Sequence, residues 1–311
     1  MLTTMLRIRR FEEKIIALYP EQQMKTPVHL YLGQEAIACG VCLNLKKEDY
    51  IFSTHRNHGH CIAKGMPLKT IMAELYGKKT GCSKGKGGSM HLVDPDRGIL
   101  GTSSIVGGSI PVALGAALTS KMKRNRRVSV VFFGDGAVDT GTFHECLNFA
   151  SLKRLPVIFA CENNFYATNS PLLARQPADN IFKRAKPYLI ESLRVDGNDI
   201  IKVYESAGEA IKKAKNGYGP TLIEYRTYRF RQHVGPDCDY ETGCRPKEEL
   251  DRWMRNCPIK RFKGFLLKNN IISLNEIDKI TTKIDKEIKE ATIFAENSPF
   301  PEEGELLEDV Y

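Results

Sequence analysis

The sequence predicts an α/β protein with a doubly wound, mostly parallel sheet and helical extensions at both ends. Two apolar runs, "VSVVFF" from residue 128 and "PVIFAC" from residue 156, show no polar alternation, as expected of strands buried on both faces. A helical stretch at 140–153 separates them. A third unit repeats the order with a strand at 189–196, a helix at 200–215 and a strand at 220–230. Strands that alternate with helices indicate parallel pairing through crossover helices.

The chain before residue 128 is predicted to be mainly helical. Apolar residues recur every three or four positions from Met5 to Leu18, which predicts an amphipathic helix over 2–18. The elements expected after it are a helix at 33–47, a short strand at 49–53, a His-rich loop "THRNHGH" at 54–60, a helix at 67–77, a Gly- and Lys-rich stretch at 77–91 and a small-residue helix at 109–123.

The last third is predicted to contain a loop and a long helix. Residues 231–245 lack apolar periodicity and contain glycine and proline, so they are expected to form a loop. Ser273 and Glu276 have the spacing of a capping box that opens a helix over about 274–295. The acidic tail after it is expected to be extended. No stretch has the composition of a linker, so residues 1–311 are predicted to be a single domain, with an N-terminal helix at 2–18 and a C-terminal helix and tail at 273–311.

Composition and charge exclude several classes of protein. The 311 residues carry a net charge of +9. The densest basic run, 121–127, has no interleaved aromatic residues and no DNA-binding motif, so it is interpreted as a solvated face, with no nucleic-acid partner expected. No apolar run reaches the ~20 residues that span a bilayer, so no membrane partner is expected.

The cysteines point to a reducing compartment. The nine cysteines are an odd number and no secretory signal precedes them, which predicts free thiols and a cytoplasmic location. Cys39 and Cys42 form a C-x-x-C pair, but they lie in an apolar periodic stretch without a second pair. They are interpreted as buried helix thiols rather than a metal or redox site.

Two polar clusters follow the buried strands where those strands end. Gly134-Asp135-Gly136 follows the first strand, and Asn163-Asn164 follows the second. The glycine spacing does not match a dinucleotide-binding fingerprint, and no G-x-x-x-x-G-K-[ST] motif is present. Asp135 and Asn164 offer oxygen ligands of the kind that Mg²⁺ takes together with substrate phosphates. The pattern therefore indicates a metal-held diphosphate at the carboxyl edge of the sheet.

The interval between these clusters resembles the thiamine diphosphate signature, with 26 residues between Gly136 and Asn163. Further blocks are similar to one family, namely "HLYLGQEA", "STHRNHGHCIAKG", "GKGGSMH", "GILGTSSIVGGSIP" and "RFRQHVGPD". By this resemblance the chain is identified as a member of the alpha subunits of the thiamine-dependent, decarboxylating component of 2-oxo acid and acetoin dehydrogenase complexes. The resemblance implies a thiamine diphosphate-binding fold, with thiamine diphosphate and Mg²⁺ as cofactors.

The resemblance also implies a role for each matching residue. Asp135, Asn164 and the main-chain carbonyl of Tyr166 correspond to Mg²⁺ ligands. Diphosphate contacts are implied for Gly136, Ala137 and Arg56. His55 stands where relatives often have tyrosine, Ser104 replaces a frequent glycine, and Ser104 and Val106 flank the aminopyrimidine. His29 and His233 are the implied catalytic residues, with His233 also contacting the cofactor. In some relatives a serine that follows the matching histidine is phosphorylated, whereas here that position is Val234.

The family's reaction needs groups that this chain lacks. The glutamate that activates the cofactor lies on a second module of similar size, so the resemblance implies a beta subunit in an α2β2 assembly, with a lipoyl-bearing acyltransferase as a further partner. The substrate is expected to be a pyruvate-type 2-oxo acid or acetoin. Thr168 departs from the larger apolar residue that is frequent in relatives, which predicts an unusual pocket.

Several alternatives stay open at this point. One alternative is an inactive or specialised alpha homologue. Another is a basic nucleotide-binding α/β protein, and uptake of thiamine diphosphate that does not depend on salt would argue against it. His55, His58 and His60 are an alternative metal cluster. Glu145 is an alternative general acid, and Lys84 and Lys86 are alternative phosphate ligands.

Overall fold

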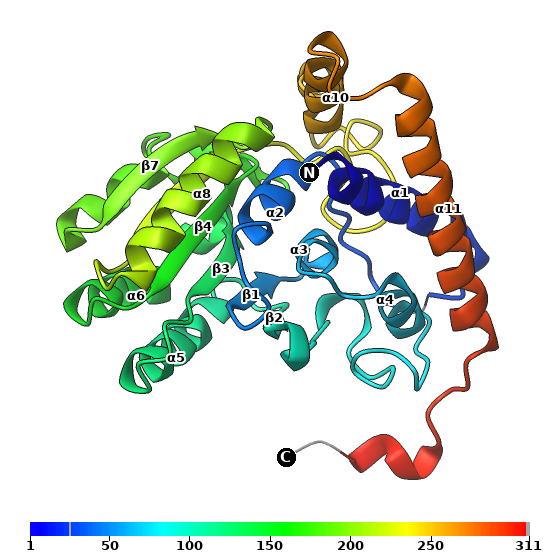
Figure 1. The fold of residues 1–311 in the computed structure, drawn as a ribbon, viewed down its shortest axis with the longest axis horizontal. Helices are drawn as coiled ribbons and strands as arrows, with labels where there is room; N and C mark the ends of the chain where they lie inside the picture. The colour runs from blue at the N-terminus through cyan, green and yellow to red at the C-terminus, as the bar shows by residue number, and fades with distance from the viewer. Residues whose placement is uncertain (25, 309–311) are drawn as a thin grey trace.

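A six-stranded parallel sheet forms the centre of the protein (Figure 1). The structure is a computed structural model that describes residues 1–24 and 26–308. The strand order is β2-β1-β3-β4-β8-β7, which confirms the doubly wound prediction. The strands are β1 Tyr50–Thr54, β2 Ile99–Ser103, β3 Ser129–Gly134, β4 Val157–Asn163, β7 Glu191–Asp196 and β8 Thr221–Arg226.

Strand β3 shows why the central apolar runs have no polar alternation. Val130 and Phe132 belong to the apolar core on one face of the sheet, whereas Val131 and Phe133 belong to the core on the other face. The first core is covered by α2 Glu35–Cys42 and α8 Ile200–Lys215, and the second by α5 Ser109–Met122 and α6 Gly141–Leu152. Successive side chains of a strand point to opposite faces, so a strand between two cores is apolar at every position.

The two ends of the chain pack together beside the sheet, as Figure 1 shows. Helix α1, Leu2–Leu18, lies against α11, Leu274–Asn297, and the ion pair between Arg10 and Asp285 links them at 2.8 Å. Helix α4, Leu68–Leu75, packs on α11 as well. Ser273 and Glu276 form the predicted capping box.

The acidic tail is not extended throughout, contrary to the sequence-based expectation. Residues Glu303–Leu307 form a short 3-10 helix, η6, and Lys79 pairs with Glu305 at 2.6 Å. Glu302 caps this turn through a reciprocal capping box with Glu305, a local pattern that outweighs the proline-rich composition. Residues 309–311 of the predicted tail lie outside the described residues.

Several short elements were not predicted. The end of the expected His-rich loop is wrong, because His58–Ala63 form helix α3. The other additions are β2, the two-residue pair β5 Tyr166–Ala167 and β6 Ser170–Pro171, and the helices α7 Leu172–Arg175, α9 Lys247–Arg255 and α10 Pro258–Lys268. The remaining 3-10 helices are η1 Tyr19–Glu21, η2 Gly88–Met90, η3 Pro95–Arg97, η4 Asp135–Asp139 and η5 Ile181–Tyr188.

The strand order places a crevice at the carboxyl edge of the sheet. From β1 the chain crosses first to β2 on one side and then to β3 on the other, so the direction of winding reverses between β1 and β3. Ligands of doubly wound sheets bind at such a point. Among the described residues, no helix combines the length and apolar character needed to cross a membrane.

Candidate active site

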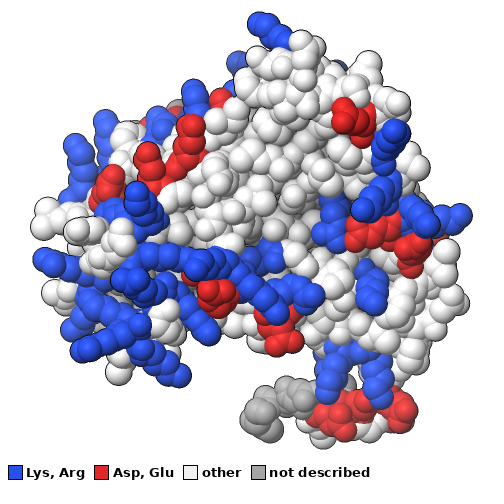
Figure 2. Space-filling model, viewed as in Figure 1, with Lys and Arg blue, Asp and Glu red and all other residues white. Residues whose placement is uncertain are grey.

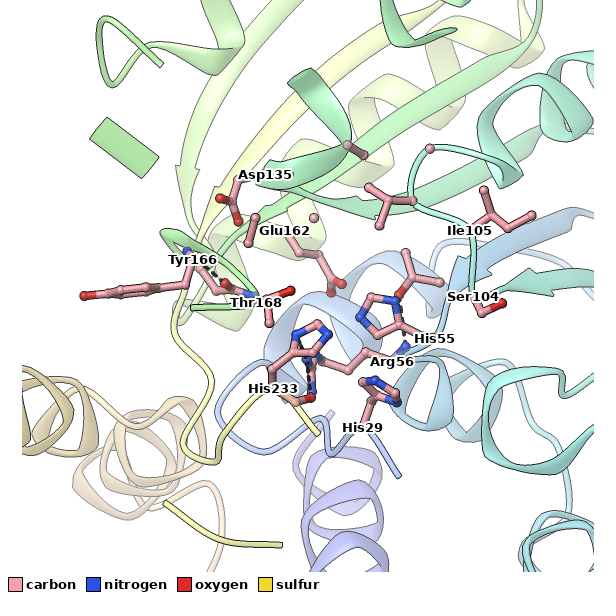
Figure 3. A pocket seen from close by; sticks show the side chains of 18 of the residues that line it. His29, His55, Arg56, Ser104, Ile105, Asp135, Glu162, Tyr166, Thr168 and His233 are labelled. Atoms are coloured by element: carbon pink, nitrogen blue, oxygen red, sulfur yellow. Dashed lines mark hydrogen bonds between the residues drawn. The ribbon is translucent and has the colours of Figure 1, made fainter. Parts of the chain in front are cut away.

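One cavity of about 230 Å³ lies at this edge, and it gathers all the residues that the sequence assigns to the site (Figure 3). Strand β1 leads to His55 and Arg56, β2 to Ser104 and Val106, β3 to Asp135, and β4 to Asn164. The assigned residues that complete the lining are Gly136, Ala137, Tyr166, His29 and His233. Residues that are separated by up to about 200 positions in the sequence thus line one cavity, because parallel strands end at the same edge of the sheet.

Asp135 and Asn164 are brought together by the pairing of β3 with β4. The parallel register places Gly134 beside Glu162, so the two polar clusters leave the sheet side by side. The Asn164 side-chain amide donates to Gln34 Oε1 at 3.0 Å, and Asn164 Oδ1 accepts from the Tyr166 main-chain N–H at 3.3 Å. The Tyr166 N–H, which can only donate, therefore fixes which atom of the Asn164 amide is oxygen, and Gln34 is the partner of its amino group.

Asp135 is a buried carboxylate with a cationic partner that the sequence did not reveal. It is 1% exposed and accepts a hydrogen bond from Arg175, which also pairs with Asp139. Burial raises the pKa of the Asp135 carboxyl, and the charge of Arg175 opposes this rise. The buried carboxylate is therefore compensated by the positive charge of Arg175.

The two residues that flank Asp135 are glycines, so no side chain covers the main chain there. A Cβ added at Gly134 would meet no atom within 4 Å and would enter the cavity space. A Cβ at Gly136 would lie 2.8 Å from the Cβ of Ala167, so a side chain cannot be accommodated without movement. Glycine at both positions keeps the backbone N–H groups of the turn η4 accessible, which suits a bulky anion.

Three histidines face one another across the opposite wall of the cavity. His29, His55 and His233 come from separate segments, and their nitrogen ligand atoms all lie within 4.8 Å of one another. Arg56 lies under them and donates to the main-chain oxygens of Leu30 at 2.8 Å and His233 at 3.1 Å. His29 Nδ1 is buried without a protein hydrogen-bond partner among the described residues. A free imidazole nitrogen beside a guanidinium is suited to form hydrogen bonds with an anionic or carbonyl substrate.

These histidines are held neutral. Burial and, after it, the positive charge of Arg56 lower the pKa to about 3 for His29, about 2 for His55 and about 3 for His233. In the unfolded chain the value is about 6.5. The unfolded state consequently binds more protons than the folded state from about pH 6.5 down to about pH 3, and stability is lost as pH falls through this window.

This linkage predicts a pH-dependent stability that His55→Gln weakens. Each such histidine removes up to about 1.4 kcal/mol of unfolding free energy per pH unit below the unfolded pKa. We expect denaturant unfolding of the cofactor-free protein at pH 7.0 and 5.5 to show a smaller loss of stability on acidification for His55→Gln than for the unmodified protein. His91→Gln, at an exposed position, serves as the control. Equal losses in His55→Gln and the unmodified protein contradict the prediction.

The metal-cluster alternative for "HRNHGH" is wrong. His58 and His60 turn away from His55 into the core, where His58 contacts Glu12 Oε1 at 3.1 Å and Ser89 Oγ at 2.8 Å. His60 contacts Ser53 Oγ at 2.8 Å and Glu162 Oε1 at 3.1 Å. Both imidazoles therefore have partners on both ring nitrogens and are structural.

Glu162, Gln34 and Arg175 are site residues that the sequence reasoning missed. Glu162 lines the cavity and is 3% exposed, with its Oε1 also accepting a hydrogen bond from Tyr31. A carboxylate inside an otherwise apolar strand was the available signal for it. Gln34 and Arg175 act through Asn164 and Asp135, and no spacing in the sequence marks them. The remaining unassigned lining residues are Thr54, Met90, Ile105, Gly107, Gly134, Ala167 and Thr168.

Two further alternatives from the sequence do not meet the cavity. Glu145 is exposed on α6 and does not line it. Lys86 Nζ donates instead to the main-chain oxygens of Glu305 and Glu308, the latter at 2.8 Å. The Gly- and Lys-rich stretch thus binds the C-terminal tail.

The loop 231–245 has two parts with different anchoring. A loop without apolar periodicity is expected from its sequence to bury little surface. That expectation is wrong for the second part, because Asp239 and Arg245 are 2% and 3% exposed and pair at 2.5 Å. Arg245 also donates to the Arg229 main-chain oxygen at 3.0 Å. The first part carries His233 and contains no such buried ion pair; it is held by hydrogen bonds such as those from the Gly235 N–H to the Val28 oxygen at 2.8 Å and from Arg56 to the His233 oxygen at 3.1 Å.

We predict that cofactor binding protects only the first part of this loop. Hydrogen exchange of residues 231–237 is expected to slow when thiamine diphosphate, Mg²⁺ and the beta subunit are added, because His233 gains a fixed partner. Residues 239–245 are expected to be protected in both states by the buried ion pair. Unchanged exchange at 231–237 contradicts a role for His233 in holding the cofactor.

The mouth of the cavity exposes apolar side chains. Ile105 and Val106 are 71% and 55% exposed, and they lead directly into α5, where Val112 is 59% exposed. Exposed apolar groups that rim a polar cavity are typical of a surface covered by another chain.

Comparison with known proteins agrees with this geometry. Residues 3–303 match the family described as dehydrogenase E1 component. The chain is 47% identical over 307 residues to the alpha subunit of acetoin:2,6-dichlorophenolindophenol oxidoreductase of Bacillus subtilis (strain 168), covering 99% of this chain and 91% of that protein. It is 40% identical over 309 residues to the chloroplastic pyruvate dehydrogenase E1 component subunit alpha-3 of Arabidopsis thaliana, with coverage of 97% and 72%. It is also 40% identical over 306 residues to the Cupriavidus necator subunit named like that of B. subtilis, with coverage of 98% and 91%. The chain therefore belongs to the dehydrogenase E1 component family.

Proposed function

We propose that this chain is the alpha subunit of a thiamine diphosphate-dependent dehydrogenase that acts on a pyruvate-type 2-oxo acid or on acetoin. Membership of the E1 family implies thiamine diphosphate, and the similarity to proteins named as alpha subunits implies a beta-subunit partner. The observation that carries the proposal is the single cavity in which Asp135 and Asn164 face Arg56 and three neutral histidines.

The donor set fits a diphosphate held by Mg²⁺. Asp135, Asn164 Oδ1 and the Tyr166 main-chain carbonyl supply hard oxygen atoms at one end of the cavity. The bare turn at Gly136 and Ala137, together with Arg56 and His233, supplies N–H donors and positive charge for the phosphate oxygens. Gly134 leaves the space that a side chain would fill. Ser104 and Val106, at the cavity mouth, are assigned to the aminopyrimidine end, and His55 to the wall between the two ends.

The residues of this chain have distinct roles in the proposed reaction. Thiamine diphosphate, when bound, supplies a nucleophilic carbon and an electron sink for cleavage of the bond next to the carbonyl. His29 and His233 are neutral at pH 7, so each offers one N–H that donates a hydrogen bond to a substrate oxygen and one ring nitrogen that accepts a hydrogen bond or a proton. Burial, together with the charge of Arg56, keeps both imidazoles neutral, and Arg56 also attracts an anionic 2-oxo acid.

We propose that the chain forms an α2β2 assembly with the beta subunit. This assembly passes the acyl group to a lipoyl-bearing acyltransferase. Ile105, Val106 and the surface of α5 supply apolar area for a second subunit. The two cores lie on opposite faces of one sheet, which supports treating residues 1–311 as one domain. The nine cysteines are free thiols, which supports a reducing compartment such as the cytoplasm.

A substrate screen tests the proposal. The chain is co-expressed with a beta-type subunit of the same family, and the purified assembly is assayed with 2,6-dichlorophenolindophenol as electron acceptor. We expect turnover of pyruvate or acetoin that requires thiamine diphosphate and Mg²⁺, and weaker turnover of branched-chain 2-oxo acids. An assembly that binds the cofactor but turns over none of these substrates would support an inactive homologue instead.

A further inference from the structure

A concave basic surface lies at the amino edge of the sheet, opposite the active-site cavity. Figure 2 shows Lys and Arg side chains crowding the lower left of the view, over the outer ends of α5 and α6, where Asp and Glu are sparse. A cavity of about 260 Å³ opens here. Its basic lining residues are Lys121, Arg124, Arg126, Arg127, Arg154 and Lys215, and no carboxylate lines it.

The topology explains why these residues meet. Strands β3, β4 and β8 are neighbours and parallel, so the segments that lead into them lie together at one edge. Residues 123–128 precede β3, residues 153–156 precede β4, and residues 216–220 precede β8. Lys121 Nζ donates to the Lys153 main-chain oxygen and so links the end of α5 to the turn before β4. The cavity is therefore formed by the turns and connecting segments that lead into these three strands.

Two of the basic side chains at this cavity already have partners within the protein. Lys215 pairs with the buried Asp49 at 2.5 Å, and Asp49 also accepts main-chain N–H bonds from Lys46 and Val128. The Arg127 guanidinium lies 5.3 Å from the centroid of the Tyr50 ring. Asp49, the carboxylate that pairs here, is thus committed to local contacts.

Three arginines have no such use. Across residues 1–24 and 26–308, the side chains of Arg124, Arg126 and Arg154 have no recorded hydrogen bond or ion pair, and all three are exposed at the cavity. Each also has a left-handed backbone, with φ of 51°, 60° and 44°. Glycine adopts that conformation at lower cost, so these positions hold a guanidinium despite a backbone penalty of about 1 kcal/mol or more each.

We propose that this cavity is a second ligand site, which binds a compact polyphosphate, either free or carried on a nucleotide. Guanidinium groups bind phosphate oxygens in pairs of parallel hydrogen bonds, and several of them around one concavity match a small, highly charged anion. The concave shape and limited volume favour such a ligand over an extended acidic chain, which needs a longer basic track.

Calorimetry with inorganic tripolyphosphate tests the site. The αβ assembly is first loaded with thiamine diphosphate and Mg²⁺, so that its active site is filled, and free Mg²⁺ is then removed. The test variant is Arg124→Glu/Arg126→Glu/Arg154→Glu. The control is Lys279→Glu/Lys283→Glu/Lys286→Glu on the exposed face of α11, which changes the net charge equally. We expect the test variant to bind about tenfold or more weakly and the control to bind as the unmodified protein does.

Further arms identify the source of the phosphate. ATP that binds more tightly than tripolyphosphate indicates a nucleotide, equal affinities indicate the polyphosphate alone, and adenosine is expected not to bind. The neutral variant Arg124→Gln/Arg126→Gln/Arg154→Gln guards against misfolding and is expected to weaken binding as well. The proposal is overturned if tripolyphosphate and ATP do not bind, if the test variant and the control lose affinity equally, or if the arginines bind only an acidic peptide or RNA.

Discussion

Replacing Asp135 with alanine is expected to abolish Mg²⁺-dependent thiamine diphosphate binding in the αβ assembly. Asp135 supplies the only ionised oxygen among the three proposed metal ligands, since Asn164 and the Tyr166 carbonyl are neutral. Its loss also removes one of the two carboxylates that pair with the Arg175 guanidinium next to the proposed metal position. We expect the affinity measured by calorimetry to fall by at least about 100-fold.

The fold is expected to survive this change. Arg175 keeps its second partner, Asp139, so no unpaired charge is left buried. Asp135→Asn, which preserves the side-chain volume, guards against a packing effect and is expected to lose binding too. Asp139→Ala is the matched control, because it removes the other partner of Arg175 and leaves the metal ligands in place. Wild-type affinity in Asp135→Ala sinks the metal assignment.

The isolated chain is expected to show neither decarboxylation of 2-oxo acids nor cleavage of acetoin, and activity is expected to appear when the beta subunit is added. The cavity mouth is open at Ile105 and Val106, and the small-residue helix α5 continues that surface with Val112 exposed. Without a partner, this apolar surface is expected to drive homo-oligomers or aggregates. Assays and sedimentation of the chain with and without its beta subunit provide the measurement.

Two glycines in different helices provide a test of which surface contacts the beta subunit. Gly115 on α5 and Gly264 on α10 both have no atom within 4 Å of an added Cβ, so arginine fits at either position in the isolated chain. We expect Gly115→Arg to prevent assembly and Gly264→Arg to leave it intact. Robust turnover by the isolated chain refutes the dependence on a partner, and normal assembly of Gly115→Arg places the interface elsewhere.

The sequence by itself determined the architecture of the sheet. Continuous apolar runs such as 128–133 predict strands between two cores, and the helices at 140–153 and 200–215 predict parallel crossovers. Both patterns depend on local periodicity, which the sequence displays directly. The interval between Asp135 and Asn164 also identified which strand ends meet, because parallel strands finish at the same edge. Short elements such as α3 and β2 escaped because a few residues carry too little periodic signal.

Only the tertiary structure decided which polar side chains belong to the site. "HRNHGH" contains three similar histidines, yet only His55 lines the cavity. His58 is buried and hydrogen-bonded to Glu12 and Ser89, and His60 is buried and hydrogen-bonded to Ser53 and Glu162. The partners Arg175 and Gln34 were likewise invisible, because each acts across a distance in sequence of 40 or 130 residues. Periodicity reports which face of an element is buried. Which charged side chains pair with one another depends on how those faces pack, and no local sequence pattern predicts that packing.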